Sequence, residues 1–456
     1  MAAFSASELA SWAHGEWTVP PRSVVTGFGT DTRTLRAGDV FVAVRTAHRD
    51  GHDFLGAARA QGAACAFVGQ RVADDLPQLV VDDPLVALRR VAAQWRHRFA
   101  GRVVGVTGSV GKTSTKELLA ALLGESAFVT EANLNNLIGV PLMLLRIEPG
   151  RHRFAVIEAG MSEPGELGIS ARLIRPDLAI VTAVTAAHLE GVGSLAAVAR
   201  EKAELIAALA DGGQAVIPVS LLQWPEFAAH AARCIAVQFA GEPAPAVAPA
   251  CLISAQVEES GEGRQLVLDG KVFPLNAISD GQARNAALAL VAARLLGEPD
   301  TRLAAALVQW MPPAGRGSVH TVGAQTFIVD CYNSSPAALL DAAQSFDRLS
   351  RHVSAPRLFV LGGMAELGSS SAQLHRDCGA QLPLRAGDQV VVFGGEAAAF
   401  LQGVALPGVG LAVAANLEEL TARVQAHPGF IFLKGSRSFA LERSLPPALR
   451  VALSFH

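Results

Sequence analysis

The first hundred residues alternate short apolar runs with alanine-rich, helix-forming sequence. Residues of β-type follow one another in three runs, Val40 to Val44, Ala64 to Val68 and Gln78 to Val81. The segment from Asp53 to Gln61 lies between the first two runs and has a helical composition. Apolar runs of strand length that are separated by helical segments are typical of α/β domains. We therefore predict a small α/β domain at residues 1–98.

A second unit begins with the strand run Val103 to Val106, because this run leads into a glycine-rich loop and then into a helix that extends to Leu123. Further apolar runs, interleaved with helical segments, follow at Phe154 to Ile157, Leu178 to Val184 and Ala215 to Pro218. Strands that alternate with helices usually pair in parallel. We predict a mostly parallel sheet in a central domain at residues 99–314.

The segment Met311 to Gly315 contains two prolines and a glycine and marks the end of the central domain. Four more apolar runs follow, again with helical segments between them: Phe327 to Val329, Leu358 to Leu361, Val390 to Phe393 and Phe430 to Leu433. This pattern predicts a doubly wound, Rossmann-like domain at residues 315–456. The predicted fold class is α/β with three domains, and the 456 residues are indeed too many for one core.

Composition and charge argue against several classes of protein. The net charge is -3 with acidic and basic residues interspersed, so we expect no nucleic acid partner. The five cysteines are widely separated and form no C-x-x-C pair, which argues against disulfides and zinc. No apolar run approaches the roughly 20 residues that cross a bilayer, and the N-terminus lacks the features of a signal peptide. We expect a cytoplasmic protein without a membrane span.

The strongest chemical signal is the loop after the strand run Val103 to Val106. It reads Gly105-Val106-Thr107-Gly108-Ser109-Val110-Gly111-Lys112-Thr113. Backbone N–H groups at the start of the next helix can bind phosphate oxygens, Lys112 can reach the β- and γ-phosphates, and the Thr113 hydroxyl can bind Mg²⁺. The strict P-loop pattern has glycine where Val106 stands, so the alternative is a glycine turn that only begins a helix. The strand, the G-K-T triplet and the helix together favour phosphate binding.

Two polar residues follow neighbouring strands of the predicted central sheet. Glu158 comes directly after the run Phe154 to Ile157, and His188 follows the next run. Ligands of open α/β sheets bind at the carboxyl ends of strands. Taken alone, each residue is more often structural, as a solvated carboxylate or a hydrogen-bonded histidine. Together with Thr113 they would complete a divalent-metal site with the oxygen ligands that Mg²⁺ prefers.

Lys202 falls on an apolar stripe of a predicted helix whose N-cap is Ser194. The stripe is formed by residues at helical spacing, Leu195, Val198, Ala199, Leu205, Ile206 and Leu209. An inward lysine must extend its ammonium to the surface, pair with an anion, lose its proton or be modified, because an unpaired buried ammonium is costly. Extension to the surface is the ordinary outcome. A neutral amine near a metal can instead react with CO₂ to give a carbamate.

Three strands of the third domain end in polar sequence. Asp330 is followed by Cys331 to Pro336, the second strand by Gly362 to Gly368, and the last by Lys434 to Arg437. The carboxyl ends of these strands would open onto one crevice. The alternative is turn chemistry and helix capping, which is the expected role of Ser334 and Ser335. It is less convincing for Lys434, which follows directly on an apolar run.

Together these segments resemble the Mur ligases over almost the whole chain. The resemblance rests on motifs in all three domains: Asp31 to Arg33, Gly38 to Ala43 and Asp50 to Phe54; Asn133 to Pro141, Glu158 to Gly160, His188 to Glu190 and Lys202 to Glu204; Asp330 to Asn333, Glu366 to Gly368 with His375, and Lys434 to Arg437. The third-domain motifs favour the member of the family that adds a dipeptide. The family's own form of the phosphate loop has Val106-Thr107-Gly108 before Gly111-Lys112-Thr113.

The resemblance implies an ATP-dependent, ADP-forming ligase of peptidoglycan precursor synthesis. ATP would phosphorylate the terminal carboxylate of UDP-MurNAc-tripeptide, and the amine of D-alanyl-D-alanine would attack the acyl phosphate. The domain at 1–98 would bind the UDP-sugar substrate, the P-loop ATPase domain at 99–314 would bind ATP, and the domain at 315–456 would bind the amino substrate. We expect a monomer whose partners are these small molecules.

The resemblance also implies roles for individual residues. Four would be catalytic: Lys112, Lys202, His188 and Asp330. The nucleotide would contact Gly108, Ser109, Val110, Gly111, Lys112, Thr113, Ser114, Asn285 and Arg316. Two Mg²⁺ ions would be held by Thr113, Glu158, His188 and Lys202, the last as a carbamate. The other substrates would contact Thr32, Arg33, His52, Asn135, Asn136, Asn333 and Lys434.

Five positions depart from the family pattern. Ala183 replaces an asparagine, Gly281 and Gln282 replace a His-Asn pair that bears on the adenine contact, and Val329 and Gly363 replace aspartates. These departures motivate a different interpretation, a noncatalytic nucleotide-binding scaffold, against which the retained Lys112, Glu158 and Lys202 argue. A folylpolyglutamate- or cyanophycin-type synthetase, a pathway-specific paralogue, and a P-loop switch or kinase are competing interpretations. The first-domain motifs argue against the two synthetases, and a switch or kinase has no use for Lys202.

Overall fold

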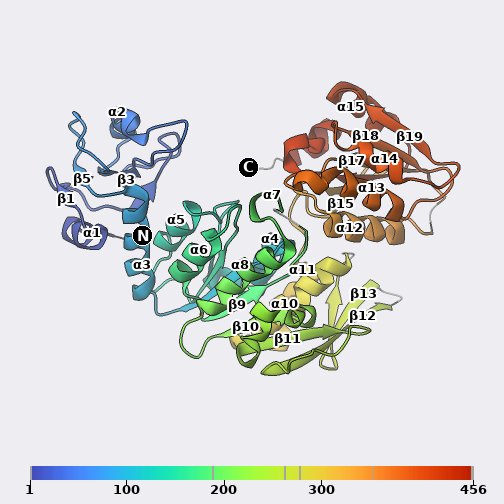
Figure 1. The fold of residues 1–456 in the computed structure, drawn as a ribbon, viewed down its shortest axis with the longest axis horizontal. Helices are drawn as coiled ribbons and strands as arrows, with labels where there is room; N and C mark the ends of the chain where they lie inside the picture. The colour runs from blue at the N-terminus through green and yellow to red at the C-terminus, as the bar shows by residue number, and fades with distance from the viewer. Residues whose placement is uncertain (1–2, 187–188, 261–262, 277–278, 353, 453–456) are drawn as a thin grey trace.

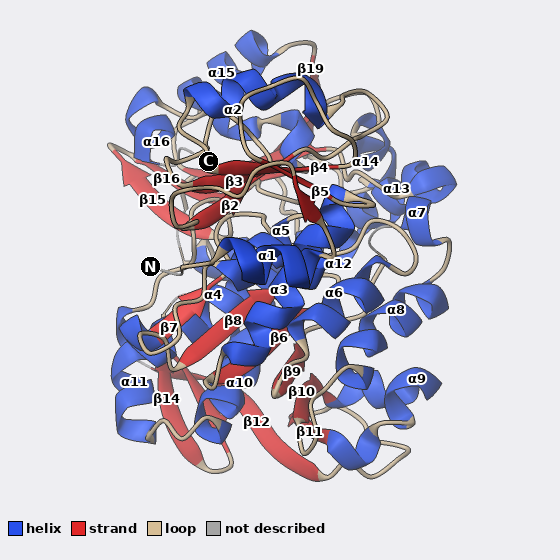
Figure 2. Cartoon of the chain, turned by 90° about the vertical axis from the view of Figure 1, so that its left-hand side faces the viewer, coloured by secondary structure: helices blue, strands red, loops and turns tan. Residues whose placement is uncertain are grey.

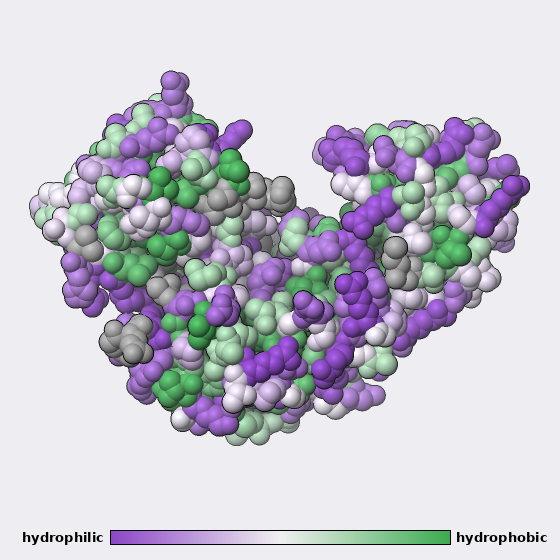
Figure 3. Space-filling model, turned by 180° about the vertical axis from the view of Figure 1, so that it is seen from behind, coloured by the Kyte–Doolittle hydropathy of each residue, from purple (hydrophilic) through white to green (hydrophobic). Residues whose placement is uncertain are grey.

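The computed structural model describes residues 3–186, 189–260, 263–276, 279–352 and 354–452. Three sheets of five, nine and six strands are built from successive stretches of the chain. The N-terminal and C-terminal lobes stand on either side of the central lobe (Figure 1). A notch separates two lobes in the space-filling view, where hydrophilic and hydrophobic side chains are interspersed over the visible face (Figure 3). This α/β architecture with three sheets is the predicted one.

The first sheet has the strand order β1-β5-β4-β3-β2 and is parallel except for β1. The three predicted strands are present as β3, β4 and β5, and the predicted helix is a 3₁₀ turn followed by α2. The elements are α1 (Ala6–Ala13), β1 (Glu16–Trp17), β2 (Gly27–Gly29), β3 (Asp39–Val42), η1 (Gly51–Phe54), α2 (Leu55–Ala60), β4 (Cys65–Val68), β5 (Gln78–Val80) and α3 (Pro84–Arg98).

Helix α3 joins the first sheet to the central one. Asp83 caps it by accepting hydrogen bonds from the N–H groups of Leu85 and Val86, and Pro84 occupies its first turn. Its apolar face contributes Trp95 to a core that includes residues of both sheets, and the Trp95 indole donates to the Ile147 carbonyl at 3.0 Å. Figure 2 shows α1 and α3 between the first-domain strands and the central strands. The first domain is therefore anchored by continuous packing.

The central sheet has the order β14-β13-β12-β11-β10-β9-β6-β8-β7. The seven strands from β12 to β7 in this order are parallel, in line with the predicted mostly parallel sheet. The predicted strands are β6, β8, β9 and β10, whereas β7, β11, β12 and the antiparallel extension β13 and β14 were not predicted. The strands are β6 (Arg102–Thr107), β7 (Ala127–Val129), β8 (Phe154–Glu158), β9 (Leu178–Val181), β10 (Gln214–Pro218), β11 (Cys234–Phe239), β12 (Cys251–Ser260), β13 (Gly263–Leu268) and β14 (Lys271–Leu275).

Helices pack against both faces of the central sheet. One core joins α4, α10 and α11 to the sheet, and others join α5, α6 and α8 to the opposite side. The helices are α4 (Lys112–Leu123), η2 (Gly124–Ser126), α5 (Gly139–Leu145), α6 (Glu166–Ile174), α7 (Leu189–Val192), α8 (Leu195–Ala207), η3 (Val219–Gln223), α9 (Pro225–Ala228), η4 (Ala231–Arg233), α10 (Asp280–Leu295) and α11 (Asp300–Gln309). This leaves the carboxyl ends of the parallel strands open.

The third sheet has the order β15-β16-β20-β17-β18-β19 and is parallel except for β15. The four predicted strands are β16, β17, β18 and β20, whereas β15 and β19 were not predicted. The elements are β15 (Ser318–Val322), β16 (Gln325–Asp330), α12 (Pro336–Leu349), β17 (Arg357–Gly362), η5 (Gly368–Ser370), α13 (Ser371–Gln381), β18 (Gln389–Phe393), α14 (Ala398–Gly403), β19 (Gly410–Ala414), α15 (Leu417–Ala426), β20 (Phe430–Lys434), η6 (Arg437–Phe439), η7 (Leu441–Ser444) and α16 (Pro447–Ala452). No helix in the described ranges has the length and apolar character needed to cross a membrane.

Candidate active site

A cavity of about 650 Å³ lies between the central domain and the third domain. The central domain lines it with the phosphate loop, the end of β8 and the start of α10, and the third domain lines it with the ends of β16 and β20 and the start of α12. Most predicted site residues of these two domains line this cavity: Ser109, Val110, Gly111, Lys112, Thr113, Ser114, Asn135, Asn136, Glu158, Asn285, Arg316, Asp330, Asn333 and Lys434. Gly108 directly precedes this set.

The remaining predicted residues lie elsewhere. Lys202 is buried outside the cavity lining, and His188 lies outside the described residues. Thr32, Arg33 and His52 belong to the first domain. The exposed Arg33 pairs with Asp31 at 2.6 Å, whereas the buried His52 has both ring nitrogens engaged, Nδ1 with Asp50 at 2.5 Å and Nε2 with the N–H of Gly69 at 2.9 Å. Substrate contacts by these three residues stay predictions.

The phosphate loop has a conformation that requires its glycines. Gly111 is the N-cap of α4 with φ +83°, and no described side chain caps the helix. A Cβ on Gly111 would lie 2.5 Å from Oδ1 of Asn285, and one on Gly108 would collide with the Thr182 hydroxyl. The first N–H groups of a helix have no intrahelical acceptor, so they are free to bind an anion. The loop therefore fits phosphate groups, and the interpretation as a simple turn has less support.

Backbone groups after β9 fix the position of this loop. The N–H of Ser109 donates to the carbonyl of Ala183 at 2.8 Å, and the N–H of Thr185 donates to the Ser109 hydroxyl at 3.0 Å. The strand predicted over Leu178 to Val184 ends at Val181. The N–H of Thr182 still donates to the Thr107 carbonyl at the end of β6, at 2.9 Å, and the residues that follow bond to the loop. Ala183 contributes its carbonyl, which explains how alanine can stand at a position where the family has asparagine.

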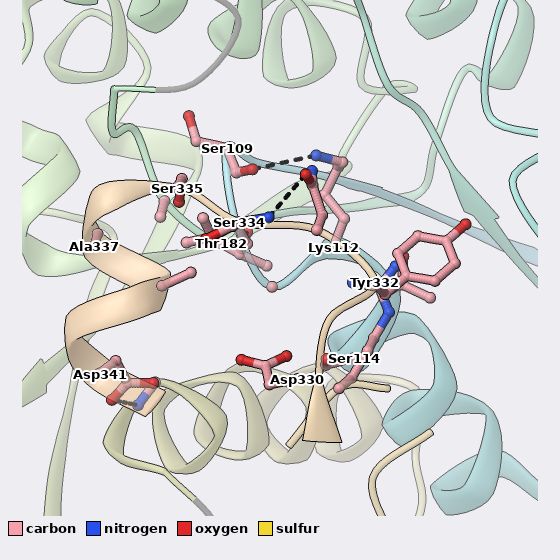
Figure 4. Close-up of a pocket in the computed structure, with 18 of the residues that line it drawn as sticks. Ser109, Lys112, Ser114, Thr182, Asp330, Tyr332, Ser334, Ser335, Ala337 and Asp341 are labelled. Carbon is pink, nitrogen blue, oxygen red and sulfur yellow. Dashed lines mark hydrogen bonds between the residues drawn. The ribbon is translucent and has the colours of Figure 1, made fainter. Parts of the chain in front are cut away.

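Lys112 extends back over the loop. Its Nζ donates to the carbonyls of Gly108 at 2.7 Å and Ser109 at 3.4 Å, and the bond to Ser109 is drawn in Figure 4. Burial lowers the pKa of the Lys112 ammonium, while the carboxylates of Glu158 and Glu366 act in the opposite direction. A lysine held by neutral carbonyls in a buried loop is an incompletely compensated charge, and phosphate oxygens would compensate it.

Glu158 supplies the carboxylate expected of a cation site. Its Oε1 accepts hydrogen bonds from the Thr113 hydroxyl at 3.2 Å and from the Asn135 amide at 2.7 Å. Its Oε2 is buried and has no hydrogen-bond partner in the described part of the chain. A buried carboxylate oxygen without a donor is unfavourable unless a cation binds it. These residues therefore fit Mg²⁺, although no three His, Cys, Asp or Glu side chains of the described residues cluster as a metal site by themselves.

Lys202 points inward, as its position on the apolar stripe predicts. Ser194 caps α8 by accepting from the N–H of Ala197 at 3.2 Å, and Lys202 is completely buried. Its Nζ has no hydrogen-bond partner among the described residues. Burial first, and then the charge of Lys112, lower the pKa of Lys202 well below its ordinary value. The ordinary outcome, extension of the ammonium to the surface, is wrong for this residue, and the neutral amine that carbamate formation requires is favoured.

At the third-domain side of the cavity, Lys434 forms a buried cross-strand pair. Its Nζ donates to Oδ2 of Asp330 at 2.6 Å and to the carbonyl of Asn333 at 2.9 Å. Arg316 reaches across from the interdomain segment, where Nη2 donates to the Thr113 hydroxyl at 3.0 Å and the guanidinium lies over the Tyr332 ring at 4.2 Å. Groups of the central and third domains thus meet directly in the cavity.

The expectation of helix capping at the start of α12 is wrong. Ser335 is the N-cap residue, but its side chain makes no hydrogen bond to the helix. The hydroxyls of Ser334 and Ser335 are both buried without a partner among the described residues. A capping serine normally accepts from the second or third N–H of its helix. Residue type and position alone could not reveal that this bond is not made.

Asp341 was not predicted from the sequence, and it lines the cavity from the second turn of α12. Its Oδ1 accepts from the N–H of Gly281 at 2.9 Å. A Cβ on Gly281 would lie 2.6 Å from the other oxygen of Asp341. The departure at Gly281 is therefore matched by Asp341, which fills the space of the missing side chain. An acidic residue on an amphipathic helix gives no signal of this role.

Two other departures have local compensation. Gln282 completes a capping box with Ser279 at the start of α10, and its Nε2 donates to the carbonyl of Arg316 at 2.8 Å. A Cβ on Gly363 would lie 2.5 Å from the ring of Phe439, so this ring excludes the aspartate of the family pattern. Val329 is completely buried in the core of the third domain. Gln282 and Gly363 thus have local partners that suit the residue present in this chain.

Comparison with protein families matches all three parts of the chain. Residues 24–96 match the Mur ligase family, catalytic domain; residues 106–293 match the Mur ligase middle domain; and residues 315–437 match the Mur ligase, glutamate ligase domain. The chain is 33% identical over 426 residues to the UDP-N-acetylmuramoyl-tripeptide–D-alanyl-D-alanine ligase of Escherichia coli, covering 91% of each protein. It is 34% identical over 359 residues to the ligase of the same name from Synechocystis, covering 77% of this chain and 76% of that protein.

Solved structures agree over nearly the full length. A crystal structure of MurF from Acinetobacter baumannii superposes with a TM-score of 0.85 at 26% identity, covering 97% of this chain and 98% of that one. The MurF ligase of Thermotoga maritima, solved in complex with ADP, superposes with a TM-score of 0.78 at 27% identity, covering 92% and 96%. Sequence and fold agree across all three domains, and this chain belongs to the Mur ligase family.

Proposed function

We propose that this chain catalyses the ATP-dependent joining of D-alanyl-D-alanine to UDP-MurNAc-tripeptide, with release of ADP and phosphate. The relatives from Escherichia coli and Synechocystis carry the name of that reaction. The observation that carries the proposal is the cavity in which the phosphate loop faces the strand ends of the third domain. A ligase of this kind must bring a phosphoryl donor, a carboxylate and an amine together in one chamber.

In the first step, a carboxylate oxygen of the tripeptide attacks the γ-phosphorus of ATP, and the bond between this phosphorus and ADP breaks. Negative charge spreads over the transferred phosphoryl oxygens, so catalysis depends on positioning and on electrostatic compensation. The N–H groups at the start of α4 and the ammonium of Lys112 are in place to supply it. Arg316 brings a second cation from the interdomain segment. We assign the nucleotide contacts to these groups, to Ser114 and to Asn285.

Thr113, Glu158 and a carbamate on Lys202 would hold Mg²⁺, with His188 as a further predicted ligand outside the described residues. The buried, partnerless Oε2 of Glu158 and the Nζ of Lys202, which has no partner in the described ranges, support this assignment. When bound, the cations neutralise charge on the phosphoryl group. Carbamate formation converts the buried Lys202 amine into an anion. The modification would thereby convert a buried amine without a partner into a metal ligand or a group that orients one.

In the second step, the neutral amine of the dipeptide attacks the carbonyl carbon of the acyl phosphate, phosphate leaves, and the nitrogen releases one proton to solvent while it keeps the other as the amide N–H. Water would hydrolyse the acyl phosphate if it entered freely, so the meeting of two domains around the cavity protects the intermediate. Asn333 and Lys434 belong to the third-domain face and are assigned to the amino substrate. Asn135 and Asn136 belong to the central domain and are assigned to the nucleotide sugar substrate, together with Thr32, Arg33 and His52 of the first domain.

An assay with purified protein tests the proposal. Phosphate release from ATP, and formation of the pentapeptide product by mass spectrometry, should both require UDP-MurNAc-tripeptide and D-alanyl-D-alanine together. A folded protein that binds ATP but forms no product with this pair would be a noncatalytic scaffold, and the proposal would be wrong. The monomeric state and the cytoplasmic location stay predictions.

Lys202→Ala tests the carbamate. We expect turnover to fall by about 10³-fold or more, since the carbamate that would hold Mg²⁺ beside the transferred phosphoryl group is lost. Wild-type enzyme in buffer depleted of CO₂ should lose activity and regain it on addition of bicarbonate, whereas the variant should not respond to bicarbonate. Turnover in Lys202→Ala close to that of the wild type would show that the lysine has only a packing role.

A further inference from the structure

The start of α12 presents two hydroxyl groups that nothing in the described protein uses. Ser334 is 5% exposed and Ser335 is 6% exposed, and neither hydroxyl has a hydrogen-bond partner among the described residues. Both residues line the cavity, next to Ala337 and Ala338 of the first helical turn. Figure 4 shows the two serines at the beginning of this helix and Asp341 farther along it. An unpaired buried hydroxyl is unfavourable, so two together indicate a ligand.

The backbone at this point adds further donors. The first turn of α12 closes when the N–H of Leu339 donates to the carbonyl of Ser335 at 2.9 Å. The N-cap side chain makes no bond to the helix, so it leaves the N–H groups of Ala337 and Ala338 without the usual cap. Alanine at both positions adds no bulk in front of these groups. A 14-residue helix thus begins at the cavity with uncapped N–H groups and two hydroxyls, which is an arrangement that favours an anion.

The cations nearby are already engaged. Lys434 is paired with Asp330 and also donates to the carbonyl of Asn333, whose side-chain oxygen in turn accepts from the N–H of Ser334 at 2.8 Å. Lys112 and Arg316 contact the phosphate loop and Thr113. A negative group could therefore bind at the start of α12 without breaking an ion pair. This holds for the described third-domain residues that line the cavity.

We propose that Ser334, Ser335 and the first turn of α12 form an oxyanion-binding site that holds a substrate by hydrogen bonds. This inference rests on the proposed function. Two sources share the chemistry, the C-terminal carboxylate of the incoming dipeptide and the phosphoryl group of the nucleotide. The carboxylate is the expected source, because the phosphoryl group already has the phosphate loop, Lys112 and Arg316. The two serines are then residues that orient the dipeptide so that its amine faces the acyl phosphate.

The test compares the double variant Ser334→Ala/Ser335→Ala with the wild type and with Gln344→Ala, a control at an exposed residue of the same helix that does not line the cavity. We expect the KM for D-alanyl-D-alanine to rise by about tenfold or more in the double variant, the scale of one or two hydrogen bonds to a charged group. The KM for ATP and that for the nucleotide sugar substrate should stay within about twofold. Gln344→Ala should behave as the wild type.

A dipeptide with a C-terminal amide in place of the carboxylate separates the sources. The wild type should use the amide less well than the acid, and the double variant should have lost most of this discrimination. A rise confined to the KM for ATP would assign the site to the phosphoryl group instead. Unchanged KM values for all substrates, in a wild type that forms product, would overturn the site and leave the proposed function intact. Absence of product in the wild type would instead overturn the proposed function.

Stability provides an independent check. Because neither hydroxyl caps the helix and both are buried without a partner among the described residues, the double variant should unfold at the same temperature as the wild type or above it in the absence of substrates, whereas loss of a real N-cap would lower the unfolding temperature. Addition of D-alanyl-D-alanine, together with the nucleotide sugar and a nonhydrolysable ATP analogue, should raise the unfolding temperature of the wild type more than that of the double variant. A large loss of stability without ligands would show that the serines are structural caps.

Discussion

Helices α4 and α12 both begin at the cavity, but only the start of α4 has a sequence from which a binding role can be predicted. At α4, glycine provides both the positive φ of Gly111 and the space beside Asn285, so the geometry restricts the residue type. At α12, the residue before the helix is a serine, which is a common kind of cap, and yet its side chain makes no bond to the helix. A site can be predicted from sequence where the backbone conformation restricts the residue type, as positive φ restricts it to glycine. It is hidden where its residues also have an ordinary structural use.

The largest expected effect concerns the α4 side of this comparison. Lys112→Met should lower turnover by about 10³-fold or more, because it removes a cation from the transferred phosphoryl group. It should not destabilise the protein, since burial already lowers the pKa of this ammonium and its hydrogen bonds go to carbonyls of its own loop. Product formation and thermal unfolding measure the two effects separately. A clear loss of stability with normal turnover would reverse the assignment.

A lysine-to-methionine substitution on the α12 side should mainly reduce stability, whereas Lys112→Met should mainly reduce turnover. Lys434→Met leaves the Asp330 carboxylate without its partner at the carboxyl ends of β16 and β20, where Lys434 is 2% exposed. Removing one member of a buried pair destabilises by about 3 kcal/mol or more, and the start of α12 would lose its hydrogen bond from Lys434 to the Asn333 carbonyl. Chemical unfolding of the variant should show this loss.

The double variant Lys434→Met/Asp330→Asn serves as its control. It removes the uncompensated charge and should regain most of the stability without regaining activity. Equal stability of Lys434→Met and the wild type would show that the pair contributes nothing to the fold, and that α12 is positioned by its packing alone.

The fold was largely predictable because its strands are buried on both faces. Continuous apolar runs such as Val103 to Val106 and Leu358 to Leu361 can hardly form anything else between helical segments. Several strands that were missed, such as β7, β15 and β19, lie at sheet edges, whereas the missed β11 is a buried strand in the interior of the central sheet. In β19, Leu411 and Val413 are 45% and 51% exposed, so burial does not impose a strand pattern there. The hairpin of β13 and β14 was missed although a local signal was present, because the two-residue turn Asp269-Gly270, with both residues at positive φ, joins the two strands.

The site was predictable to the extent that single residues break a local pattern. Lys202 was found because a lysine on an apolar stripe is anomalous, and its complete burial agrees with that reasoning. Asp341 was missed because its partner, the N–H of Gly281, lies 60 residues away on another domain. Gly281 appeared as a defect in the family pattern, although it is one half of a contact. Such pairs become visible only when the domains are placed together.

The smallest expected effect tests this contact, and it depends on pH. Burial raises the pKa of the Asp341 carboxyl, and the charges of Asp280 and Asp330 add to the shift, while hydrogen bonds from Ser279 and Gly281 oppose it. Between the ordinary carboxyl pKa of about 3.9 and the raised value, the folded chain keeps a proton that the unfolded chain releases. The free energy of unfolding therefore decreases as pH rises through this window. Below the window Asp341 is protonated in both states and does not affect it.

Asp341→Asn removes the titration and retains an oxygen that can accept from the N–H of Gly281. We expect the variant to be more stable than the wild type near pH 7 by the order of 1 kcal/mol, the scale of one buried polar group. The difference should shrink towards zero as the pH is lowered past the ordinary carboxyl pKa. Thermal unfolding of both proteins over a series of pH values measures it, and Asp211→Asn, at an exposed carboxylate in a turn of the central domain, is the control. If the stability difference between the variant and the wild type stays constant with pH, Asp341 acts only as an ordinary hydrogen-bond acceptor between α12 and α10. In that case this junction, unlike the phosphate loop, has no buried charge that requires compensation.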